Sequence, residues 1–343
     1  MGAEPARFTQ TLPPRGQLLA EPGPLASVAA DVLRWLAANP DDPAASGSVL
    51  AGAGSHAEAQ ATLRWLVEVE RADRGASAQR LLSPDFLAEH LRFRQWVPDR
   101  AGAEARGIAL GEGEIRLTKY LAWRVTGRRT REPGFDCALY EVPTDELHVN
   151  VAGRTDLMRY RFTRREVLDG AFEAGGPAAG GARALAWLPR SAVHEALMQG
   201  TVVVVFPTGP ELTLNVHRNN GVAWRPEVAR QPELQGRLWY FREVVGLQGY
   251  GGDDKVLLHP RVVVAGDVLS LGLGSLFALV WAAQGQEYMR LVVLADTGGA
   301  FHPNLFQLDW LVGTFANRTA FETAASAMPD RVRAFAVSAR GGV

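Results

Sequence analysis

The chain has 343 residues, of which 47% are hydrophobic and 21% are charged, an ordinary balance for a globular protein that can bury a sizeable core, and the length favours two domains. Its 36 basic and 37 acidic residues leave a net charge of -1, so we expect no broad positive surface of the kind that binds nucleic acid. An arginine-rich run between residues 124 and 131 is a local exception, and such a run is more often a solvated face.

Cys137 is the single cysteine, which excludes an intrachain disulfide and a cysteine-based metal site. No apolar run approaches the ~20 residues that a membrane-spanning helix needs. The first residues, MGAEPARFTQ, lack the charged-then-apolar profile of a signal peptide. We therefore expect any secretion signal, and any cysteine that carries a lipid anchor, to lie upstream of residue 1.

The N-terminal quarter is predicted to be helical after a proline-rich, extended start at residues 1–24. Apolar residues follow helical spacing over residues 26–38 and again over residues 57–74. Ser83 precedes Pro84 as an N-cap precedes a proline in the first turn, which predicts a third helix through about residue 90.

The remainder is predicted to be rich in β-structure, because short β-branched or aromatic segments alternate with turn signals. Helices are expected only near residues 163–172 and 316–327, and the glycine-rich stretches 175–182 and 246–252 are expected to be loops, the second of them mobile. The fold class is therefore α+β and mostly β. The predicted strands are 115–127, 138–143, 147–153, 201–207, 212–217, 237–244, 256–266, 275–282, 290–295 and 331–339.

Familiar catalytic motifs are missing from the sequence. The seven histidines are scattered without a metal-binding spacing, and neither a nucleophile elbow nor a phosphate-binding loop is present. Cys137 sits in a strand-like context, where a small buried hydrophobe is the simplest interpretation. Carboxylate chemistry remains.

Two aspartates stand beside long apolar runs. Asp296 follows the strand RLVVLA and precedes Thr-Gly-Gly, a position where an aspartate usually bonds the backbone of its own turn. Asp309 lies between Leu308 and Trp310. A carboxyl held against aromatic surface has its charged form disfavoured, which makes it a candidate general acid; the alternative is an exposed residue on an alternating strand.

From about residue 83 onwards the chain resembles the membrane-bound lytic murein transglycosylase A (MltA) family. RLVVLADTGGAFHPNLFQLDWLVG, residues 290–313, is similar to the family's strand–Asp-Thr-Gly-Gly-Ala segment and the Asp-x-Phe-x-Gly turn after it. Residues 184–209, 217–224, 119–143 and 259–272 resemble further family segments, in the family's order. Several weak matches in the correct order carry more weight than any one alone.

The resemblance implies a double-psi β-barrel with N-terminal helices, formed by residues 1–122 and 236–343. It also implies a second β-barrel, residues 123–235, inserted between them to form the other wall of a glycan groove. The implied reaction cleaves the β-1,4 bond between N-acetylmuramic acid and N-acetylglucosamine in peptidoglycan and leaves a 1,6-anhydro end. The family needs no metal or cofactor.

The resemblance also implies roles for individual residues. Asp309 would act as acid and base, and Asp296 would orient or hydrogen-bond near it. The implied substrate-binding residues are Gln199, Thr201, Asn220, Tyr120, Trp123 and Asp267, although barrel core is an equally good interpretation of Tyr120 and Trp123. Site motifs differ more than scaffold motifs: Val202 stands where the family has a glycine, and Ala265 takes the place of an aspartate, with Asp267 displaced by two residues.

Two functions follow. The first is a periplasmic lytic transglycosylase, associated with the outer membrane if an upstream lipid anchor exists, whose partners are peptidoglycan glycan strands. The second is a catalytically impaired protein of the same fold that binds or scaffolds the cell wall. Retention of Asp309 favours the first, and the altered site motifs favour the second.

Overall fold

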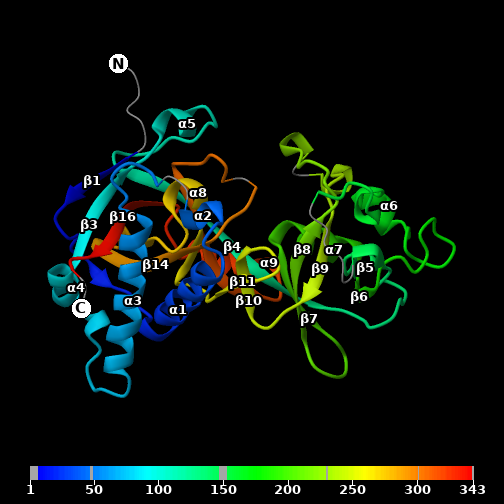
Figure 1. Ribbon diagram of the computed structural model, residues 1–343, viewed down its shortest axis with the longest axis horizontal. Helices are drawn as coiled ribbons and strands as arrows, with labels where there is room; N and C mark the ends of the chain where they lie inside the picture. The colour runs from blue at the N-terminus through cyan, green and yellow to red at the C-terminus, as the bar shows by residue number, and fades with distance from the viewer. Residues whose placement is uncertain (1–6, 47–48, 147–152, 229–230, 300, 342–343) are drawn as a thin grey trace. The chain divides into compact units, whose positions relative to one another are not determined.

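The computed structural model describes residues 7–46, 49–146, 153–228, 231–299 and 301–341, and the chain forms two compact units (Figure 1). Unit 1 contains residues 1–120, 249–313 and 322–343, and unit 2 contains residues 121–248 and 314–321. The sequence places an inserted domain at 123–235, a range that lies inside unit 2.

The helices of unit 1 begin and end where local sequence signals place them. They are α1 (Pro22–Ala38), α2 (Pro43–Ser46), α3 (His56–Asp73), α4 (Pro84–His90), α5 (Arg100–Glu104) and α8 (Val268–Leu271), with the short 3-10 helix η1 (Arg80–Leu82). Ser55 and Glu58 form a reciprocal capping box at the start of α3. Ser83 accepts a hydrogen bond from the backbone of Phe86 and so caps α4.

Six strands of unit 1 close into a ring, in the order β16-β13-β14-β12-β15-β4, because β4 also pairs with β16. The ring is formed by β4 (Glu114–Thr126), β12 (Val263–Ala265), β13 (Leu276–Ala283), β14 (Gln286–Asp296), β15 (Gln307–Phe315) and β16 (Arg331–Ala339). β3 (Leu91–Val97) and β1 (Arg7–Thr11) extend the sheet from β16, and β2 (Gln17–Leu18) pairs with β14. β12 is parallel to β14 and antiparallel to β15.

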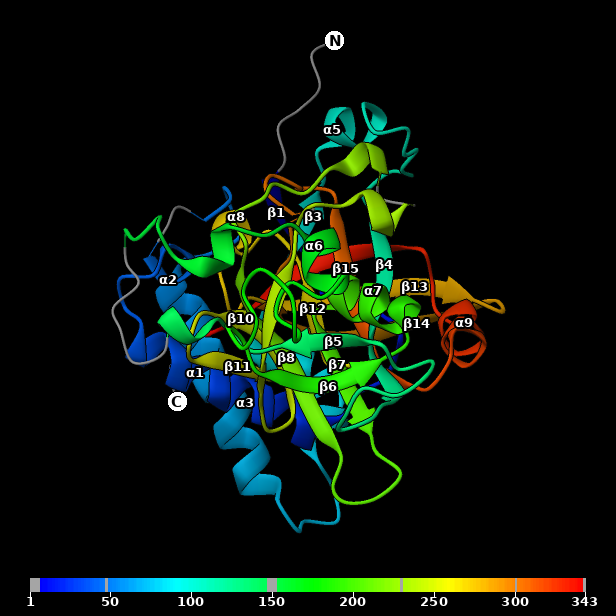
Figure 2. The ribbon, with the colours of Figure 1, turned by 90° about the vertical axis from the view of Figure 1, so that its right-hand side faces the viewer.

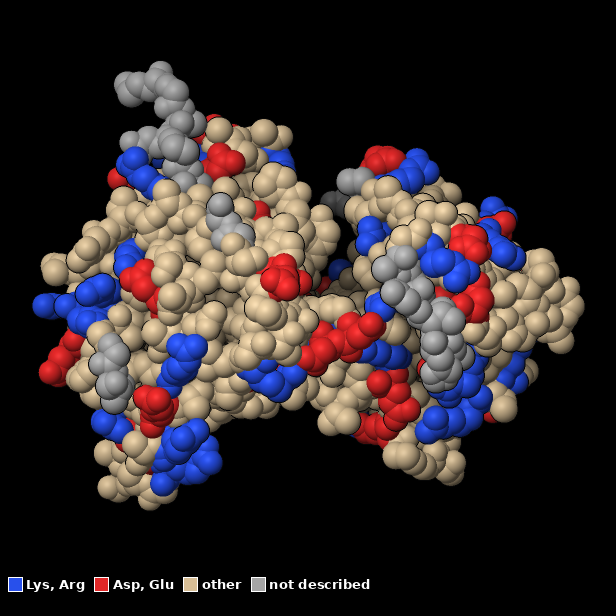
Figure 3. Space-filling view, viewed as in Figure 1, with Lys and Arg blue, Asp and Glu red and all other residues tan. Residues whose placement is uncertain are grey.

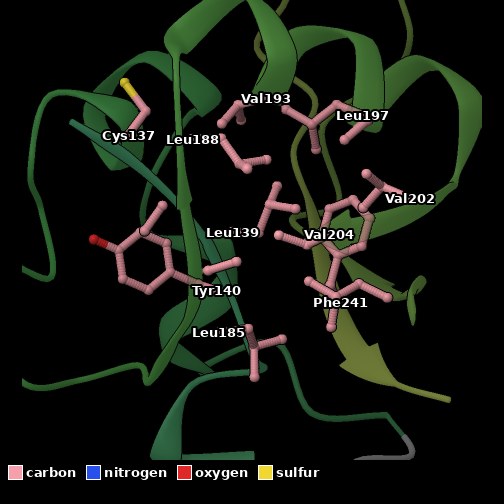
Figure 4. Packing of buried hydrophobic residues seen from close by; sticks show 14 of the residues in the cluster. Cys137, Leu139, Tyr140, Leu185, Leu188, Val193, Leu197, Val202, Val204 and Phe241 are labelled. Carbon is pink, nitrogen blue, oxygen red and sulfur yellow. The ribbon is translucent and has the colours of Figure 1, made fainter. Parts of the chain in front are cut away.

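Unit 2 has its own sheet and its own hydrophobic core. The second half of β4 pairs in parallel with β7 (Thr201–Val205), followed by β8 (Leu212–Asn219) and β9 (Trp239–Glu243). A separate two-stranded antiparallel sheet is formed by β5 (Cys137–Tyr140) and β6 (Ala184–Leu188). In the sequence, α6 (Arg164–Leu168) lies between these two strands, and α7 (Arg190–Gln199) follows β6. Figure 4 shows side chains from both sheets and from α7 converging; among them are Leu139, Leu188, Leu197, Val204 and Phe241.

Short 3-10 turns and one further helix complete the chain. The turns are η2 (Thr144–Glu146), η3 (Met158–Tyr160), η4 (Pro226–Val228) and η5 (Pro232–Leu234), and α9 (Arg318–Ser326) precedes β16. Cys137 is buried, as its strand-like context predicts. The structure is mixed α+β with a predominance of strands, and the double-psi description of the barrel stays a prediction.

The predicted helices and nearly all predicted strands occur within a few residues of their expected positions. Segment 147–152 lies outside the described residues. One expectation is wrong: residues Leu247–Gly251, expected as a mobile loop, form β10, which pairs with β11 (Lys255–Leu258). The sequence analysis also misses β3, β6, α2, α5, α7 and α8. It misses β15 as well, because residues 309–313, which the resemblance implies as a turn, lie within that strand. In β10 the glycines allow close packing, which composition alone does not distinguish from flexibility.

The surface in Figure 3 carries Lys and Arg interspersed with Asp and Glu within each unit, as the near-zero net charge predicts. Among the described residues, no helix is both long and apolar enough to cross a bilayer.

Candidate active site

The register of three neighbouring strands in unit 1 sets Asp296 and Asp309 on either side of one small residue. Ala265, on β12, pairs with Asp309 on β15 and with Asp296 at the end of β14. Residues paired across neighbouring strands lie on the same face of a sheet. The two carboxyls that the sequence singles out are therefore brought together, separated by the methyl group of a buried alanine.

β4 contributes Tyr120 and Thr118, which share a face because side chains alternate along a strand. The Tyr120 hydroxyl donates a hydrogen bond of 2.9 Å to Oδ2 of Asp296. Burial, followed by the negative charge of Asp296, raises the pKa of Tyr120 well above its ordinary value, so the hydroxyl keeps its proton. Closure of the six strands into a ring explains how a side chain on β4 reaches the end of β14.

Asp296 is half-buried and has both carboxyl oxygens engaged. Oδ2 accepts from Tyr120, and Oδ1 accepts from the backbone N–H of Thr297 at 2.8 Å, which is the turn bond that the sequence position predicts. Burial raises the pKa of Asp296 from 3.8 to about 6, against the opposing effects of those two hydrogen bonds and of the Lys255 charge. The carboxyl therefore ionises just below neutral pH.

Asp309 is also half-buried, but its Oδ1 atom is buried without a hydrogen-bond partner among the described residues. Burial raises the pKa of Asp309 from 3.8 to about 7; the Thr118 hydroxyl lowers it, and the nearby charge of Asp296 raises it. The more distant positive charges of Arg116 and Lys119 act in the lowering direction. Near pH 6.5 the favoured state is thus a protonated Asp309 beside an ionised Asp296.

Gly249 of β10 explains part of the desolvation of Asp296. A Cβ atom at this position would lie 2.7 Å from the backbone oxygen of Ala295 and 3.1 Å from Cβ of Asp296. Only a residue without a side chain lets β10 approach so closely. The glycine-rich stretch that the sequence analysis takes for a mobile loop thus packs against the end of β14, beside Cβ of Asp296.

Asp267 is displaced from this pair and caps a helix. It is buried, and its carboxyl accepts from the backbone N–H of Ser270 and from the Ser270 hydroxyl, both at 3.0 Å. Contacts through His302 nevertheless reach Thr297, whose backbone N–H bonds Asp296. Nδ1 of His302 lies 3.4 Å from Oδ1 of Asp267, and Nε2 of His302 lies 3.0 Å from the Thr297 hydroxyl.

Gln199 and Thr201 lie in unit 2, at the junction of α7 and β7. Gln199 is the last residue of α7 and is half-buried, and Gly200 after it adopts φ = 79°, a left-handed conformation that favours glycine. The Thr201 hydroxyl is buried and accepts a hydrogen bond of 2.7 Å from the Asn215 amide. The residue types at positions 199–201 are therefore explained by the end of α7 and the start of β7.

Asn220 and Trp123, also in unit 2, are buried. The Asn220 amide donates to the backbone oxygens of Phe162 and Gly236 at 3.0 and 2.9 Å, and its oxygen accepts from the N–H of Leu238 at 2.9 Å. A longer contact of 3.4 Å from the N–H of Val222 uses the remaining acceptor position. Trp123 belongs to the hydrophobic core of unit 2, which agrees with the core interpretation of that residue.

Three residues near the carboxyls escaped the sequence analysis as site candidates: Thr118, Thr297 and His302. Thr118 could have been found, because it is two residues from Tyr120 and shares its face. Thr297 could have been found as the residue whose N–H an aspartate at a strand end bonds. His302 gives no such signal, since its position depends on the path of the loop from β14 to β15.

Among the described residues there is no group of three or more His, Cys, Asp and Glu side chains able to hold a metal ion. What the pair of aspartates can do is move a proton. Asp309 holds one near neutral pH, and its Oδ1 atom has no hydrogen-bond partner among the residues that the structure describes, while Asp296 stabilises that protonated state by its charge.

No protein-family model matches this sequence, and no curated protein matches it either. Several solved structures do match. The membrane-bound lytic murein transglycosylase of Agrobacterium tumefaciens superposes with a TM-score of 0.67 at 16% identity, covering 97% of each chain. Escherichia coli MltA with bound chitohexaose has a TM-score of 0.62 at 16% identity, covering 98% of this chain and 95% of that one.

MltA from Neisseria gonorrhoeae has a TM-score of 0.59 at 14% identity, with 97% of this chain and 92% of that chain covered. The similarity extends over nearly the whole length of each protein. The resemblance that the sequence motifs indicate is thereby confirmed at the level of structure, and the chain has the fold of the MltA lytic transglycosylases.

Proposed function

We propose that this protein is a peptidoglycan lytic transglycosylase in which Asp309 is both the acid and the base. The observation that carries the proposal is the state of that carboxyl. It is half-buried, its pKa is raised to about 7, and its Oδ1 atom is buried without a partner among the described residues. A neutral carboxyl with a vacant oxygen is what protonation of a leaving group requires.

The proposed reaction needs a single carboxyl because the substrate supplies its own nucleophile. Asp309 gives its proton to the oxygen that joins N-acetylmuramic acid to N-acetylglucosamine, and the bond from that oxygen to C1 of the muramic acid breaks. The C6 hydroxyl of the same sugar attacks C1, and the Asp309 carboxylate takes the hydroxyl proton. The residue ends protonated as it began, no water enters, and the intramolecular attack benefits from a high effective concentration.

Asp296 and Tyr120 are proposed to hold Asp309 in its protonated state. The charge of Asp296 raises the pKa of Asp309. The Tyr120 hydroxyl bonds Asp296 at 2.9 Å and lowers the pKa of Asp296, so the neighbouring charge persists near neutral pH. Activity should therefore fall as the pH rises through about 7, where Asp309 loses its proton.

The structural comparisons support a glycan strand as the substrate. Solved structures of this fold are lytic transglycosylases, and one of them is described with bound chitohexaose. A periplasmic location follows from the proposed substrate, with outer-membrane association if a lipid anchor precedes residue 1. Gln199 and Thr201 stay candidates for substrate contact, and we assign Asn220 to the scaffold. No cofactor takes part in the proposed chemistry.

The second candidate is a protein of the same fold that binds the cell wall without cutting it. The observation in its favour is Ala265. The sequence resemblance implies an aspartate at this position, and here a methyl group lies between Asp296 and Asp309 in the strand register. Loss of a third carboxyl from the cluster removes a group able to bind or orient the sugar.

The test is digestion of purified peptidoglycan, with the products identified by mass spectrometry. The native protein is expected to release muropeptides with 1,6-anhydro ends. Asp309→Asn is expected to lower the rate by about 10³-fold, within the range for loss of a general acid–base group. Asp41→Asn, which changes an exposed aspartate in a turn of unit 1, is the matched control and should retain the native rate.

The second candidate would be favoured if the native protein and Asp309→Asn both bind peptidoglycan and neither releases anhydro products. Hydrolysed rather than anhydro ends would contradict the proposed use of the C6 hydroxyl. Absence of both binding and products would remove both candidate functions and leave the fold alone.

A further inference from the structure

A cavity of about 150 Å³ in unit 2 has no part in the proposed reaction. It lies between α6, α7 and the turn η5, and Figure 2 shows α6 and α7 near one another. A cavity of this size holds several water molecules or a group of a few heavy atoms. Its polar lining consists of Arg164, Arg165, Arg190, His194 and Glu233.

Arg164 is a buried cation for which the described part of the chain shows no counter-ion. Its side chain is 1% exposed, and the guanidinium donates only to backbone oxygens, from Nε to Arg237 at 2.7 Å and, at 3.4 Å, to Pro232. No carboxylate among the described residues forms an ion pair with it. Burial lowers its pKa to about 10, so the group stays charged at neutral pH, and an uncompensated buried charge is costly.

His194 lines the same cavity and has a ring nitrogen that lacks a hydrogen bond among the described residues. It is 9% exposed, and its Nδ1 atom is buried without a hydrogen-bond partner among the described residues. Burial lowers the pKa of His194, and the positive charges of Arg164 and Arg190 lower it further, while Glu233 acts in the opposite direction. Burial first, and the two arginine charges second, therefore favour the neutral form of the ring.

The other charges around the cavity compensate each other more fully. Arg190 and Arg165 share Asp169, at 2.5 and 3.5 Å, and both are solvent-accessible at the rim. Glu233 is exposed. The excess positive charge therefore lies on Arg164 at the buried end of the cavity, which His194 also lines, and water screens it least there.

We propose that this cavity binds a compact oxyanion, a carboxylate or a phosphate group. The anion would accept hydrogen bonds from the guanidinium groups of Arg164 and Arg190 and from His194, whose Nδ1 would take up a proton and donate. Guanidinium groups suit planar carboxylates and phosphates because they present several donors in a fixed geometry. Such an anion would neutralise the charge of Arg164, for which the described residues provide no carboxylate partner.

The test uses the full chain in a buffer free of phosphate and carboxylates. Inorganic phosphate and acetate are titrated separately, with sodium chloride at equal ionic strength as the screening control. Proton NMR follows the histidine Cε1–H signals, and the His194 signal is identified by its absence from His194→Gln. We expect this signal to move saturably with one or both oxyanions, and the pKa of His194 to rise in their presence.

Arginine variants distinguish specific binding of the oxyanion in the cavity from nonspecific electrostatic attraction to the protein. Arg190→Gln removes one donor and should weaken binding by about tenfold or more, the usual effect of losing a hydrogen bond to a charged group. Arg183→Gln is the matched control, because Arg183 is an exposed arginine of the same unit paired with Glu141 at 2.8 Å, and it should bind as the native chain does. Arg164→Gln should abolish binding; circular dichroism checks that it folds.

Saturation by phosphate alone would identify a phosphate site, saturation by acetate alone a carboxylate site, and saturation by both the shared class. The inference is overturned by signal changes that chloride reproduces, by an absence of saturation, or by equal binding in Arg190→Gln and the native chain. None of these outcomes depends on whether the protein cleaves peptidoglycan.

Discussion

Asp309 in unit 1 and Asn220 in unit 2 were both expected to contact the sugar, but they differ in how far the protein satisfies their hydrogen-bonding groups. The Asn220 amide uses both its donors and both acceptor positions on the backbone around Phe162, Gly236, Leu238 and Val222. Asp309 has a buried oxygen, Oδ1, that forms no hydrogen bond within the described part of the chain, and its pKa is raised. Both residue types can hydrogen-bond a sugar. The difference is that the backbone of the described residues already occupies the hydrogen-bonding groups of Asn220 and does not occupy Oδ1 of Asp309.

Arg164 extends the comparison to a buried group that cannot become neutral at physiological pH. A carboxyl in a desolvated position can keep its proton, and Asp309 is raised to a pKa of about 7. A guanidinium whose pKa falls only to about 10 remains charged. The same physical cause, removal of water, therefore produces a proton donor in unit 1 and a need for an anion in unit 2.

The largest effect on stability is expected from Asn220→Ala. The change leaves three backbone groups, the oxygens of Phe162 and Gly236 and the N–H of Leu238, without their partner. Unfolding by urea should show a loss of about 3 kcal/mol. Asn219→Ala is the control, since its side chain accepts a single hydrogen bond from Gly221 at 2.8 Å, and it should cost about 1 kcal/mol or less.

If Asn220→Ala were as stable as the native chain but bound peptidoglycan weakly, the amide would be a sugar contact and the contrast with Asp309 would fail.

Asp309→Asn is expected to change stability by a smaller amount and in the opposite direction, making the protein more stable above pH 4. Between pH 4 and 7 the folded protein keeps a proton on Asp309 that the unfolded chain releases, because the pKa is about 7 rather than 3.8. Native stability therefore falls as the pH rises through this window, and asparagine removes that loss. The variant should equal the native protein near pH 4. The full shift of the pKa, from 3.8 to about 7, corresponds to at most about 4 kcal/mol, and solvent screening of the half-buried carboxyl should reduce the gain to about 1–2 kcal/mol at pH 8, measured by urea unfolding. A stability difference that is constant with pH would contradict the raised pKa.

The smallest effect is expected from Tyr120→Phe, which removes only the hydroxyl that bonds Asp296. Since that bond lowers the pKa of Asp296, its loss keeps Asp296 neutral to higher pH. The charge that raises the pKa of Asp309 is then weaker. Cleavage at pH 7 should fall by about fivefold, the equivalent of ~1 kcal/mol, and the alkaline limb of the pH–rate profile should move to lower pH.

Tyr288→Phe provides the comparison, because Tyr288 is half-buried in the same unit and stacks on Trp281. It should leave both the rate and the profile unchanged. A fall in rate for Tyr120→Phe without movement of the profile would assign Tyr120 to substrate packing rather than to control of the carboxyls.

The sequence predicted those features that depend on local patterns. Helical spacing and the Ser83 cap located α1, α3 and α4, and apolar context singled out Asp309. The position of Asp296 at a strand end predicted a bond to the backbone of its own turn, and the structure contains one, from the N–H of Thr297, beside the bond from Tyr120.

Features that depend on tertiary register could not be predicted. The pairing of Ala265 with both aspartates follows from the order of β14, β12 and β15, which no local pattern specifies. Gly249 was interpreted as flexible because its close contact with Ala295 comes from a distant segment. The isolation of Arg164 is likewise visible only once α6, α7 and η5 are folded together.

The central claim is the protonation state of Asp309, and carbon NMR of protein labelled at the aspartate carboxyl carbons measures it most directly. Titration from pH 3 to 9 should show one carboxyl resonance with a midpoint near 7 that is absent from Asp309→Asn, and a second near 6 that belongs to Asp296. If the resonance lost in Asp309→Asn titrates near the ordinary value of 3.8, Asp309 is ionised at neutral pH and cannot be the acid.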